Sequence, residues 1–373
     1  MNFQFHSPTK IIFGSGSLET IGSNCKIYGD RAFIVSGKNS MKKHNHLKIV
    51  TDSLKKEKIL FEVFNNISPD AKSHEINEGI DLSKKFGATF IIGLGGGSSI
   101  DAAKAVAVGQ SFNKIEEIIG KTINDDVLSL PIVAVPSTSG TGSEVSKGSI
   151  VTDSKKNFKS GIRGEKVFPK LAIIDPNLSL SMPENLALET GFDAFTHLLE
   201  SYLARKSTRL SQIYSEFGLE LIFKNLPKII DKPNDIKIRA NISLAALIGG
   251  INVANASTCL PHRLQQAMGS VPEIHHPHAR GLACLYPSWL KEVFPETKKK
   301  FEKLREVLNV SDVGYDFILK FMEKIKVNNR LKDYGVEESY INIFVKNISG
   351  NVENDPIKEI NDTLIKRIYT NSI

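Results

Sequence analysis

Cysteine and tryptophan are scarce in this chain of 373 residues, which contains three cysteines and one tryptophan. Cys25, Cys259 and Cys284 lie far apart and form no CxxC pair, a spacing that excludes a zinc ribbon and a thioredoxin-type redox pair. An odd, dispersed set of cysteines is typical of structural thiols in a reducing compartment. The N-terminus also lacks a basic segment followed by an apolar one, so we expect no signal peptide and a cytoplasmic protein.

Long apolar runs are missing as well. Stretches such as FIIGLGG and LAALIGGINVANA are interrupted before they reach the roughly 18 to 20 apolar residues that span a bilayer, so we expect no membrane segment. The net charge of +7 could attract nucleic acid. The lysines, however, lie in short runs among acidic residues and form no basic stripe with interleaved aromatics, so we expect no nucleic-acid partner.

The first half of the chain alternates strand-like and helix-like segments. Short apolar runs at residues 32–37, 89–97, 131–137 and 170–176 predict buried parallel strands. Helical periodicity on both sides of the second run completes a βαβ rhythm. We therefore predict a doubly wound, Rossmann-like α/β domain over residues 1–178, with a mostly parallel sheet, and an all-helical domain over residues 179–373, where only helical periodicity remains.

A glycine-rich segment follows the second predicted strand. Gly95, Gly96 and Gly97 let the backbone approach a bulky anion, and the helix that begins there offers free amides and a positive dipole end. Ser98 and Asp101 belong to the same candidate cofactor-binding segment and also have the spacing of a capping box, and a tight structural turn is the alternative interpretation. The segment is neither GxGxxG nor a Walker motif.

A second loop rich in hydroxyl groups follows the third predicted strand. PSTSGTGSE places Ser137, Thr138 and Thr141 among two glycines and further hydroxyls, a density suited to binding phosphate and ribose. Two such loops at the carboxyl ends of parallel strands predict a dinucleotide lying across the sheet.

Histidines and one aspartate in the second half could bind a metal. Asp193 and His197 are four residues apart, which on a helix places them about 40° apart on one face. His262 and His278, brought in from later segments, would complete a four-ligand divalent metal site. Such a metal polarises the oxygen of a carbonyl or an alcohol.

These segments together resemble the iron-containing, or group III, alcohol dehydrogenases. The resemblance rests on GGGSSIDAAKAVA, PSTSGTGSEVS, IIDPNLSLSMP, GFDAFTHLLESY and the two later histidine segments, in the same order along nearly the whole chain. It implies that the first domain binds NAD(H) or NADP(H) and that Asp193, His197, His262 and His278 hold the metal in the cleft between domains. It also implies a homodimer or larger homo-oligomer.

The fourth ligand depends on which family interval is kept. Family members place the histidine nine positions before a proline, and His278 keeps that interval to Pro287. Counting forward from His262 gives His276 instead. We favour His278, because GLACLYP downstream matches the family better than VPEIHH does.

Two positions depart from the family pattern. Members that use NAD often carry an aspartate after the first strand, where this chain has Gly37 followed by Lys38, Ser40 and Lys42; cations and hydroxyls in place of a carboxylate favour NADP(H). Many relatives have a second histidine where this chain has Gln266, whose amide does not titrate near neutral pH. We therefore expect a metal-centred mechanism with a proton route through cofactor hydroxyls and water.

The predicted reaction is reversible hydride transfer between NAD(P)H and a small aldehyde or ketone. Lys159 resembles a family lysine that reaches the cofactor. The metal is expected to be Fe(II), with Zn(II) as its competitor for this ligand set. Positive side chains next to the ligands would favour an acidic carbonyl substrate: Arg263, Arg280, His275 and His276.

Three alternatives stay open. The first two are a glycerol- or glycerol-phosphate-type dehydrogenase and a dehydroquinate-synthase-like lyase. Both resemble this chain in scaffold, but their metal sites resemble a two-histidine pattern with a different spacing of the ligands. A nucleotide-binding protein without catalytic activity is the third.

Overall fold

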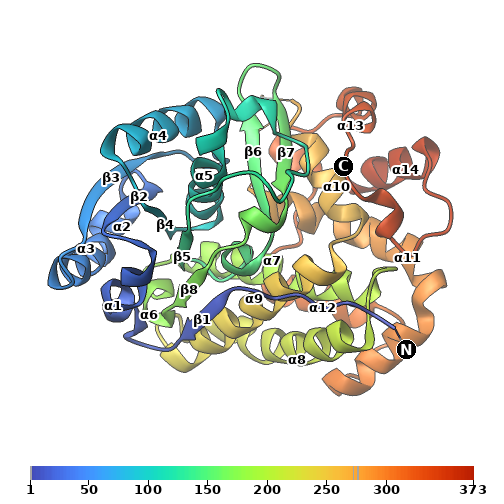
Figure 1. Ribbon diagram of the computed structural model, residues 1–373. Coiled ribbons are helices and arrows are strands. Elements are labelled where there is room, and N and C mark those ends of the chain that lie inside the picture. Colours follow the sequence, from blue (N-terminus) through green and yellow to red (C-terminus); the bar gives the residue numbers. More distant parts are fainter. Residues whose placement is uncertain (1, 272, 275–276) are drawn as a thin grey trace. The chain divides into compact units, whose positions relative to one another are not determined.

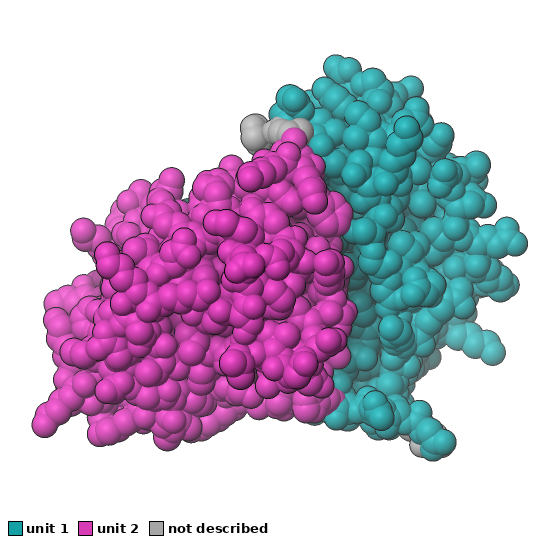
Figure 2. All heavy atoms as spheres, turned by 45° about the horizontal axis from the view of Figure 1, so that its top comes forward, with its two compact units in different colours: residues 1–5, 183–373 teal, residues 6–182 magenta. Residues whose placement is uncertain are grey.

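The computed structural model describes residues 2–271, 273–274 and 277–373. The chain forms two compact units, coloured separately in Figure 2. The N-terminal unit is His6–Met182, and the C-terminal unit is Pro183–Ile373 together with the residues before His6. The boundary expected from the sequence, after residue 178, falls inside helix α6 (Pro176–Ser179).

The N-terminal unit is built on a six-stranded parallel sheet in the order β1-β8-β5-β4-β2-β3 (Figure 1). Its strands are β1 (Lys10–Phe13), β2 (Arg31–Gly37), β3 (Leu60–Ile67), β4 (Phe90–Gly95), β5 (Ile132–Pro136) and β8 (Leu171–Ile174). The predicted α/β class is confirmed. The two edge strands, β1 and β3, were not predicted, because β1 is short and β3 mixes polar and partly exposed residues that break the apolar run.

Helices cover both faces of this sheet. Side chains alternate along β2, so that Phe33 and Val35 pack into one core while Ala32 and Ile34 pack into the other. The α-helices of this unit are α1 (Ile21–Cys25), α2 (Ser40–Lys43), α3 (His46–Lys56), α4 (Ser73–Phe86), α5 (Gly97–Val108) and α6. Short 3-10 helices are η1 (Ser17–Thr20), η2 (Lys26–Tyr28), η3 (Gly109–Ser111), η4 (Ile115–Glu117), η5 (Ser143–Val145) and η6 (Glu165–Val167).

An antiparallel hairpin, absent from the sequence-based prediction, adds a second small sheet. Strands β6 (Gly148–Asp153) and β7 (Phe158–Arg163) pair with each other, and β6 packs on α5 (Figure 1). The hairpin brings Lys159 toward the loop that precedes α4, since Thr152 opposite Lys159 also bridges to Lys72.

The C-terminal unit is helical in its described residues, as predicted. Its α-helices are α7 (Glu184–Leu203), α8 (Arg209–Asn225), α9 (Ile236–Ala256), α10 (Leu260–Met268), α11 (His278–Leu308), α12 (Asp316–Lys324), α13 (Ile341–Lys346) and α14 (Asp362–Ser372). Its 3-10 helices are η7 (Leu226–Ile229), η8 (Leu331–Tyr334), η9 (Glu338–Tyr340) and η10 (Val352–Asn354). In α11 the backbone leaves helical geometry at Thr297, just after Pro295, which removes a helical hydrogen bond.

Helix α9 is apolar along most of its length. By length and composition alone, it is the one helix among the described residues that could cross a membrane, and 61% of its most apolar window is buried. Core helices of globular proteins pass the same test.

Candidate active site

Four side chains from three helices of the C-terminal unit meet around one carboxylate oxygen. Helix α7 carries Asp193 and His197, α10 carries His262, and His278 is the first residue of α11. Oδ1 of Asp193 lies 3.8 Å from Nε2 of His197, 3.9 Å from Nε2 of His262 and 3.5 Å from Nε2 of His278. The His278 side chain is 32% exposed and the other three are buried, so the cluster is open on one side.

Two of these atoms lack the hydrogen bonds that buried polar atoms normally make. Oδ1 of Asp193 and Nε2 of His262 are buried without a hydrogen-bond partner among the described residues. Their separation is too long for a hydrogen bond, but it is close to the ~3.4 Å edge of a tetrahedron of ligands about 2.1 Å from a metal. One carboxylate oxygen and the imidazole nitrogens are donors that Fe(II) and Zn(II) both accept. The residues therefore fit a divalent metal.

Neighbouring side chains fix which nitrogen of two histidines carries the proton. Both carboxylate oxygens of Glu200 lie 2.9 Å from Nδ1 of His262, so that nitrogen donates and Nε2 keeps its lone pair. Oε1 of Gln265 accepts from Nδ1 of His278 in the same way. Glu200 also accepts from the Cys259 amide (2.8 Å) and the Tyr286 hydroxyl (3.1 Å).

Neither supporting residue, Glu200 or Gln265, was among the residues predicted from the sequence. Glu200 lies seven residues after Asp193, two turns along the same face of α7, and this spacing was a usable signal. Gln265 gives no comparable signal, because its contact with His278 joins two different helices.

Burial and the neighbouring imidazoles set the charges of the cluster. Burial alone raises the pKa of Asp193, but the imidazoles of His197, His278 and His262 together hold it well below its usual value. Burial lowers the pKa of His262 well below the ordinary histidine value, and burial raises that of Glu200 to about 7. An anionic aspartate and a neutral imidazole are the forms in which these residues bind metals.

Two arginines near the cluster already have protein partners. Arg280 donates to Oε1 of Glu189 at 2.9 Å, and Arg263 donates to Oγ1 of Thr258 at 2.7 Å and to Oε1 of half-buried Gln266 at 3.3 Å. These contacts lend no support to a substrate carboxylate bound by the two guanidinium groups. The other two residues named for this role, His275 and His276, lie outside the described residues, as does His276 in its role as the alternative fourth ligand.

The candidate cofactor loops of the N-terminal unit lie together at the carboxyl ends of its parallel strands. The chain passes from β2 to β3 on one side and then to β4 on the other, so the strand order reverses between β2 and β4. Ligands of doubly wound sheets bind beyond the carboxyl ends of the strands at such a point. Gly37 ends β2, Ser40 begins α2, Gly95 ends β4 and Ser137 follows β5, which places all four at these carboxyl ends.

The two loops are packed directly on each other. The amide of Ser137 donates to the carbonyl of Gly95 at 2.8 Å. A Cβ on Gly97 would lie 2.6 Å from Cγ2 of Thr141, and one on Gly96 would lie 3.4 Å from Cγ2 of Thr138. Gly95 has φ +145°, a conformation that other residues rarely adopt. Close packing thus requires glycine here, whether or not a phosphate binds.

The start of α5 differs from the predicted capping box. The helix begins at Gly97 with Gly96 as its N-cap, and no side chain caps it. Ser98 is already inside the helix, where its hydroxyl accepts from the amide of Asp70 at 3.2 Å. The Asp101 carboxylate instead accepts from the Ser143 hydroxyl (2.6 Å) and the Ile150 amide (3.1 Å), which ties α5 to the second loop and to β6.

Lys159 of β7 lies near the start of α5. Its Nζ is 2.5 Å from Oδ1 of Asp70, the same residue whose amide bonds Ser98. The Lys159 side chain is only 12% exposed, whereas that of Asp70 is 58% exposed. The pair places a cation beside the helix N-terminus that is predicted from the sequence to bind phosphate.

Comparison with known proteins identifies the family. The model of the iron-containing alcohol dehydrogenase family matches residues 8–176, and that of the C-terminal region of the Fe-containing alcohol dehydrogenase family matches residues 187–373. The chain belongs to the iron-containing alcohol dehydrogenases.

Relatives of this dehydrogenase cover nearly its full length. It is 27% identical to a probable NADH-dependent butanol dehydrogenase of Bacillus subtilis (strain 168), over 96% of each chain. It is 28% identical to an NADPH-dependent butanol dehydrogenase of Clostridium saccharobutylicum, over 98% of this chain and 97% of that one. An archaeal halo-thermophilic alcohol dehydrogenase from a Red Sea brine pool has a TM-score of 0.93 at 27% identity, covering 100% and 99% of the two chains.

Family membership decides the reaction class. The enzyme is an oxidoreductase that acts on alcohols with NAD(H) or NADP(H), and its family implies a divalent metal, iron. The predicted family and reaction class are confirmed. Relatives that use NADH and relatives that use NADPH are both present, so the predicted preference between them stays a prediction.

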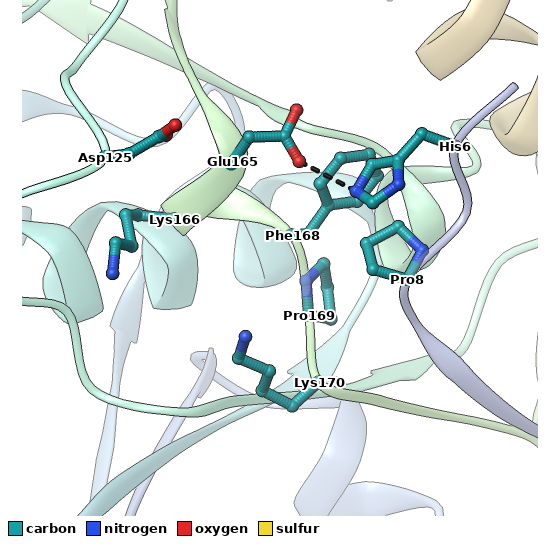
Figure 3. Close-up of a pocket in the computed structure, with 8 residues that line it drawn as sticks. All are labelled: His6, Pro8, Asp125, Glu165, Lys166, Phe168, Pro169 and Lys170. Atoms are coloured by element: carbon teal, nitrogen blue, oxygen red, sulfur yellow. Dashed lines mark ion pairs between the residues drawn. The ribbon is translucent and has the colours of Figure 1, made fainter. Parts of the chain in front are cut away.

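The dehydrogenase's N-terminal unit also contains a hollow (Figure 3). It measures about 280 Å³ and is lined by His6, Pro8, Asp125, Glu165, Lys166, Phe168, Pro169 and Lys170. These residues precede β1, β5 and β8, so they lie at the amino ends of these strands, opposite the carboxyl ends that the two candidate loops follow. Nε2 of His6 pairs with Oε2 of Glu165 at 2.9 Å across it.

Proposed function

We propose that Asp193, His197, His262 and His278 hold the divalent metal, and that the enzyme transfers hydride reversibly between NAD(P)H and a small aldehyde or ketone. The observation that carries the proposal is the pair of buried atoms, Oδ1 of Asp193 and Nε2 of His262, which face each other without hydrogen bonds among the described residues. When bound, the metal supplies a Lewis acid that polarises the substrate oxygen. The protein's part is to present these donors unprotonated, which Glu200 and Gln265 do by accepting from the opposite ring nitrogens.

Replacing the central carboxylate tests this proposal. Asp193→Asn keeps the shape but removes the charge, and we expect it to lose bound metal and to lower kcat/KM by more than the roughly 10–100-fold typical of outer-shell changes. Asp231→Asn, at an exposed position of the same unit, is the matched control. Metal content by mass spectrometry and aldehyde reduction by NAD(P)H are the measurements. An Asp193→Asn enzyme with full metal content and activity would refute the site.

For the fourth ligand we propose His278 over His276. Support comes from its Nε2, 3.5 Å from Oδ1 of Asp193, and from Gln265, which accepts from its Nδ1. We expect His278→Ala to lose metal and His276→Ala to retain it. The reverse pattern would assign the ligand to His276.

We also propose a preference for NADP(H). Gly37 ends β2 without a carboxylate, and the side chains of Lys38, Ser40 and Lys42 beyond it are exposed and could receive a 2'-phosphate. A Cβ on Gly37 would lie 3.7 Å from the Ile67 carbonyl oxygen, an ordinary contact, so a side chain fits there.

The variant Gly37→Asp tests this preference, with Gly37→Asn as its uncharged control. We expect the aspartate to lower the ratio of kcat/KM for NADPH to that for NADH by at least about tenfold, because its charge repels the 2'-phosphate. The asparagine should change the ratio much less. A wild-type enzyme that favours NADH would contradict the proposal.

We further propose a homo-oligomer, the state that the family resemblance implies. The edge strand β1 offers an unpaired side for contact with another chain, and Phe13 on it is 38% exposed. Sedimentation velocity tests this, and a monomer at micromolar concentration would contradict it.

A further inference from the structure

Two consecutive buried polar residues near the C-terminus have no role in the site described above. Asn354 ends η10 and Asp355 follows it, and they are 1% and 0% exposed. They lie more than 70 residues beyond His278 in the sequence. Buried polar groups are kept only where hydrogen bonds satisfy them, so their partners show what they do.

The Asp355 carboxylate joins the helices that carry His262 and His278. Its Oδ2 accepts from the amide of Leu260 and from the indole Nε1 of Trp289, each at 2.9 Å. Leu260 is the first residue of α10, where backbone amides have no partner within the helix and a negative charge is favoured. Trp289 belongs to α11, which begins with His278.

The Asn354 side chain joins the same region to the end of α7. Its Nδ2 donates to the carbonyls of Ala256 (2.9 Å), the last residue of α9, and of Thr258 (3.0 Å), in the link from α9 to α10. Its Oδ1 accepts from the amide of Lys206, and its carbonyl accepts from the amide of Arg205, just beyond α7. Arg205 in turn donates through Nε to the Asp355 carbonyl at 2.7 Å.

Every helix that contributes to the cluster around Asp193 is therefore bonded, directly or through its adjoining segment, to this dipeptide. We propose that Asn354 and Asp355 are positioning residues of the metal centre, which set the spacing of the ligands on α7, α10 and α11. The inference rests on the proposed metal site. It assigns no contact with substrate, cofactor or metal to either residue.

The substitution Asp355→Asn gives a sharp test because its shape is conserved. The Leu260 amide and the Trp289 indole both donate to Oδ2 of Asp355 and need an acceptor at that position. If the new amide places its NH2 group at the position of Oδ2, both bonds are lost. If it places its NH2 group at the position of Oδ1, the bond from the Ile357 amide is lost instead. Trp289 is the only tryptophan of the chain, so its fluorescence reports the local change. Glu359→Gln, at an exposed position of the same segment, is the control because it removes the same single negative charge.

Metal affinity is measured by chelator competition with Co(II), alongside NAD(P)H affinity and thermal unfolding. We expect Asp355→Asn to shift the tryptophan spectrum and to weaken Co(II) binding about tenfold, with cofactor affinity unchanged and Glu359→Gln like wild type. A shifted spectrum and a lower melting temperature with unchanged Co(II) affinity would overturn the inference alone. A wild-type chain that binds no metal would overturn the proposed site and the inference with it.

If Asp355→Asn yields no folded protein, Trp289→Phe carries the same test. It removes one donor to Oδ2 and leaves the carboxylate in place. Weaker Co(II) binding with unchanged cofactor affinity supports the inference, and wild-type Co(II) affinity overturns it.

Discussion

A single methyl group added at Gly97 is expected to separate the two candidate cofactor loops. The Cβ of an alanine there would lie 2.6 Å from Cγ2, 3.1 Å from Oγ1 and 3.2 Å from Cβ of Thr141. Carbon atoms in contact prefer about 3.5–4.0 Å, so the loops must move apart by roughly 1 Å. The Gly97 backbone is helical, so steric contact and not backbone strain is the cause.

The size of the effect follows from two opposing contributions. Inserting a methyl group into a packed region costs about 1–3 kcal/mol, and replacing glycine by alanine in a helix returns up to about 1 kcal/mol. The net loss of stability should therefore lie between about 0 and 3 kcal/mol. The displacement acts on the predicted phosphate-binding backbone. Misplacement by about 1 Å can reduce a rate by about 100-fold. We therefore expect a large loss of kcat/KM for the cofactor beside a modest loss of stability.

The assay is steady-state kinetics with varied NAD(P)H, together with thermal unfolding. Gly148→Ala is the control, because a Cβ on Gly148 meets nothing within 4 Å. The double variant Gly97→Ala, Thr141→Ser removes the methyl group that lies closest, keeps the hydroxyl and should recover part of the cofactor KM. Unchanged cofactor kinetics in Gly97→Ala, or no recovery in the double variant, would show that contact between Gly97 and Thr141 does not set the geometry of these loops.

Three further outcomes are expected. Burial raises the pKa of Glu144 to about 7 from 4.5, so the folded chain binds its proton more tightly than the unfolded chain, and stability falls as pH rises between these values. As the pH rises from about 4.5 to 8, the free energy of unfolding of Glu144→Gln should therefore increase by up to about 3 kcal/mol relative to that of wild type, measured by denaturant titration. Parallel pH profiles of the two proteins would count against this. Glu200→Gln should weaken metal binding by about 10–100-fold in chelator competition, and unchanged affinity would show that its bond to His262 is dispensable. Gln266→His should add an ionisation near pH 6–7 to the kcat profile, and an unaltered profile would place residue 266 outside the proton route.

The central part of the fold could be predicted because its strands are buried on both faces. Continuous apolar runs such as residues 90–95 identify a central parallel strand, and glycines at its end mark the loop. Edge strand β3 has polar and partly exposed residues, so it lacks that signal. In the β6–β7 hairpin, β6 alternates half-buried and buried residues and β7 has only three consecutive buried residues, and this weaker pattern was missed.

The ligand candidates could be named from spacing and family likeness, but their supports could not. Asp193 and His197 lie on one helix, so their separation follows from helical geometry. The contacts of Gln265 with His278 and of Asp355 with Leu260 and Trp289 join segments that meet only in the folded chain. No local pattern encodes such contacts, which therefore require the structure.

Metal dependence is the most direct test of the proposed site. The purified enzyme is stripped with a chelator under anaerobic conditions, titrated with Fe(II), and assayed for aldehyde reduction by NADPH and NADH at each step. We expect one metal ion bound per chain, activity that disappears on stripping and returns in proportion to bound metal, and no return in Asp193→Asn. Full activity in the metal-free enzyme, or metal bound equally by Asp193→Asn, would contradict it.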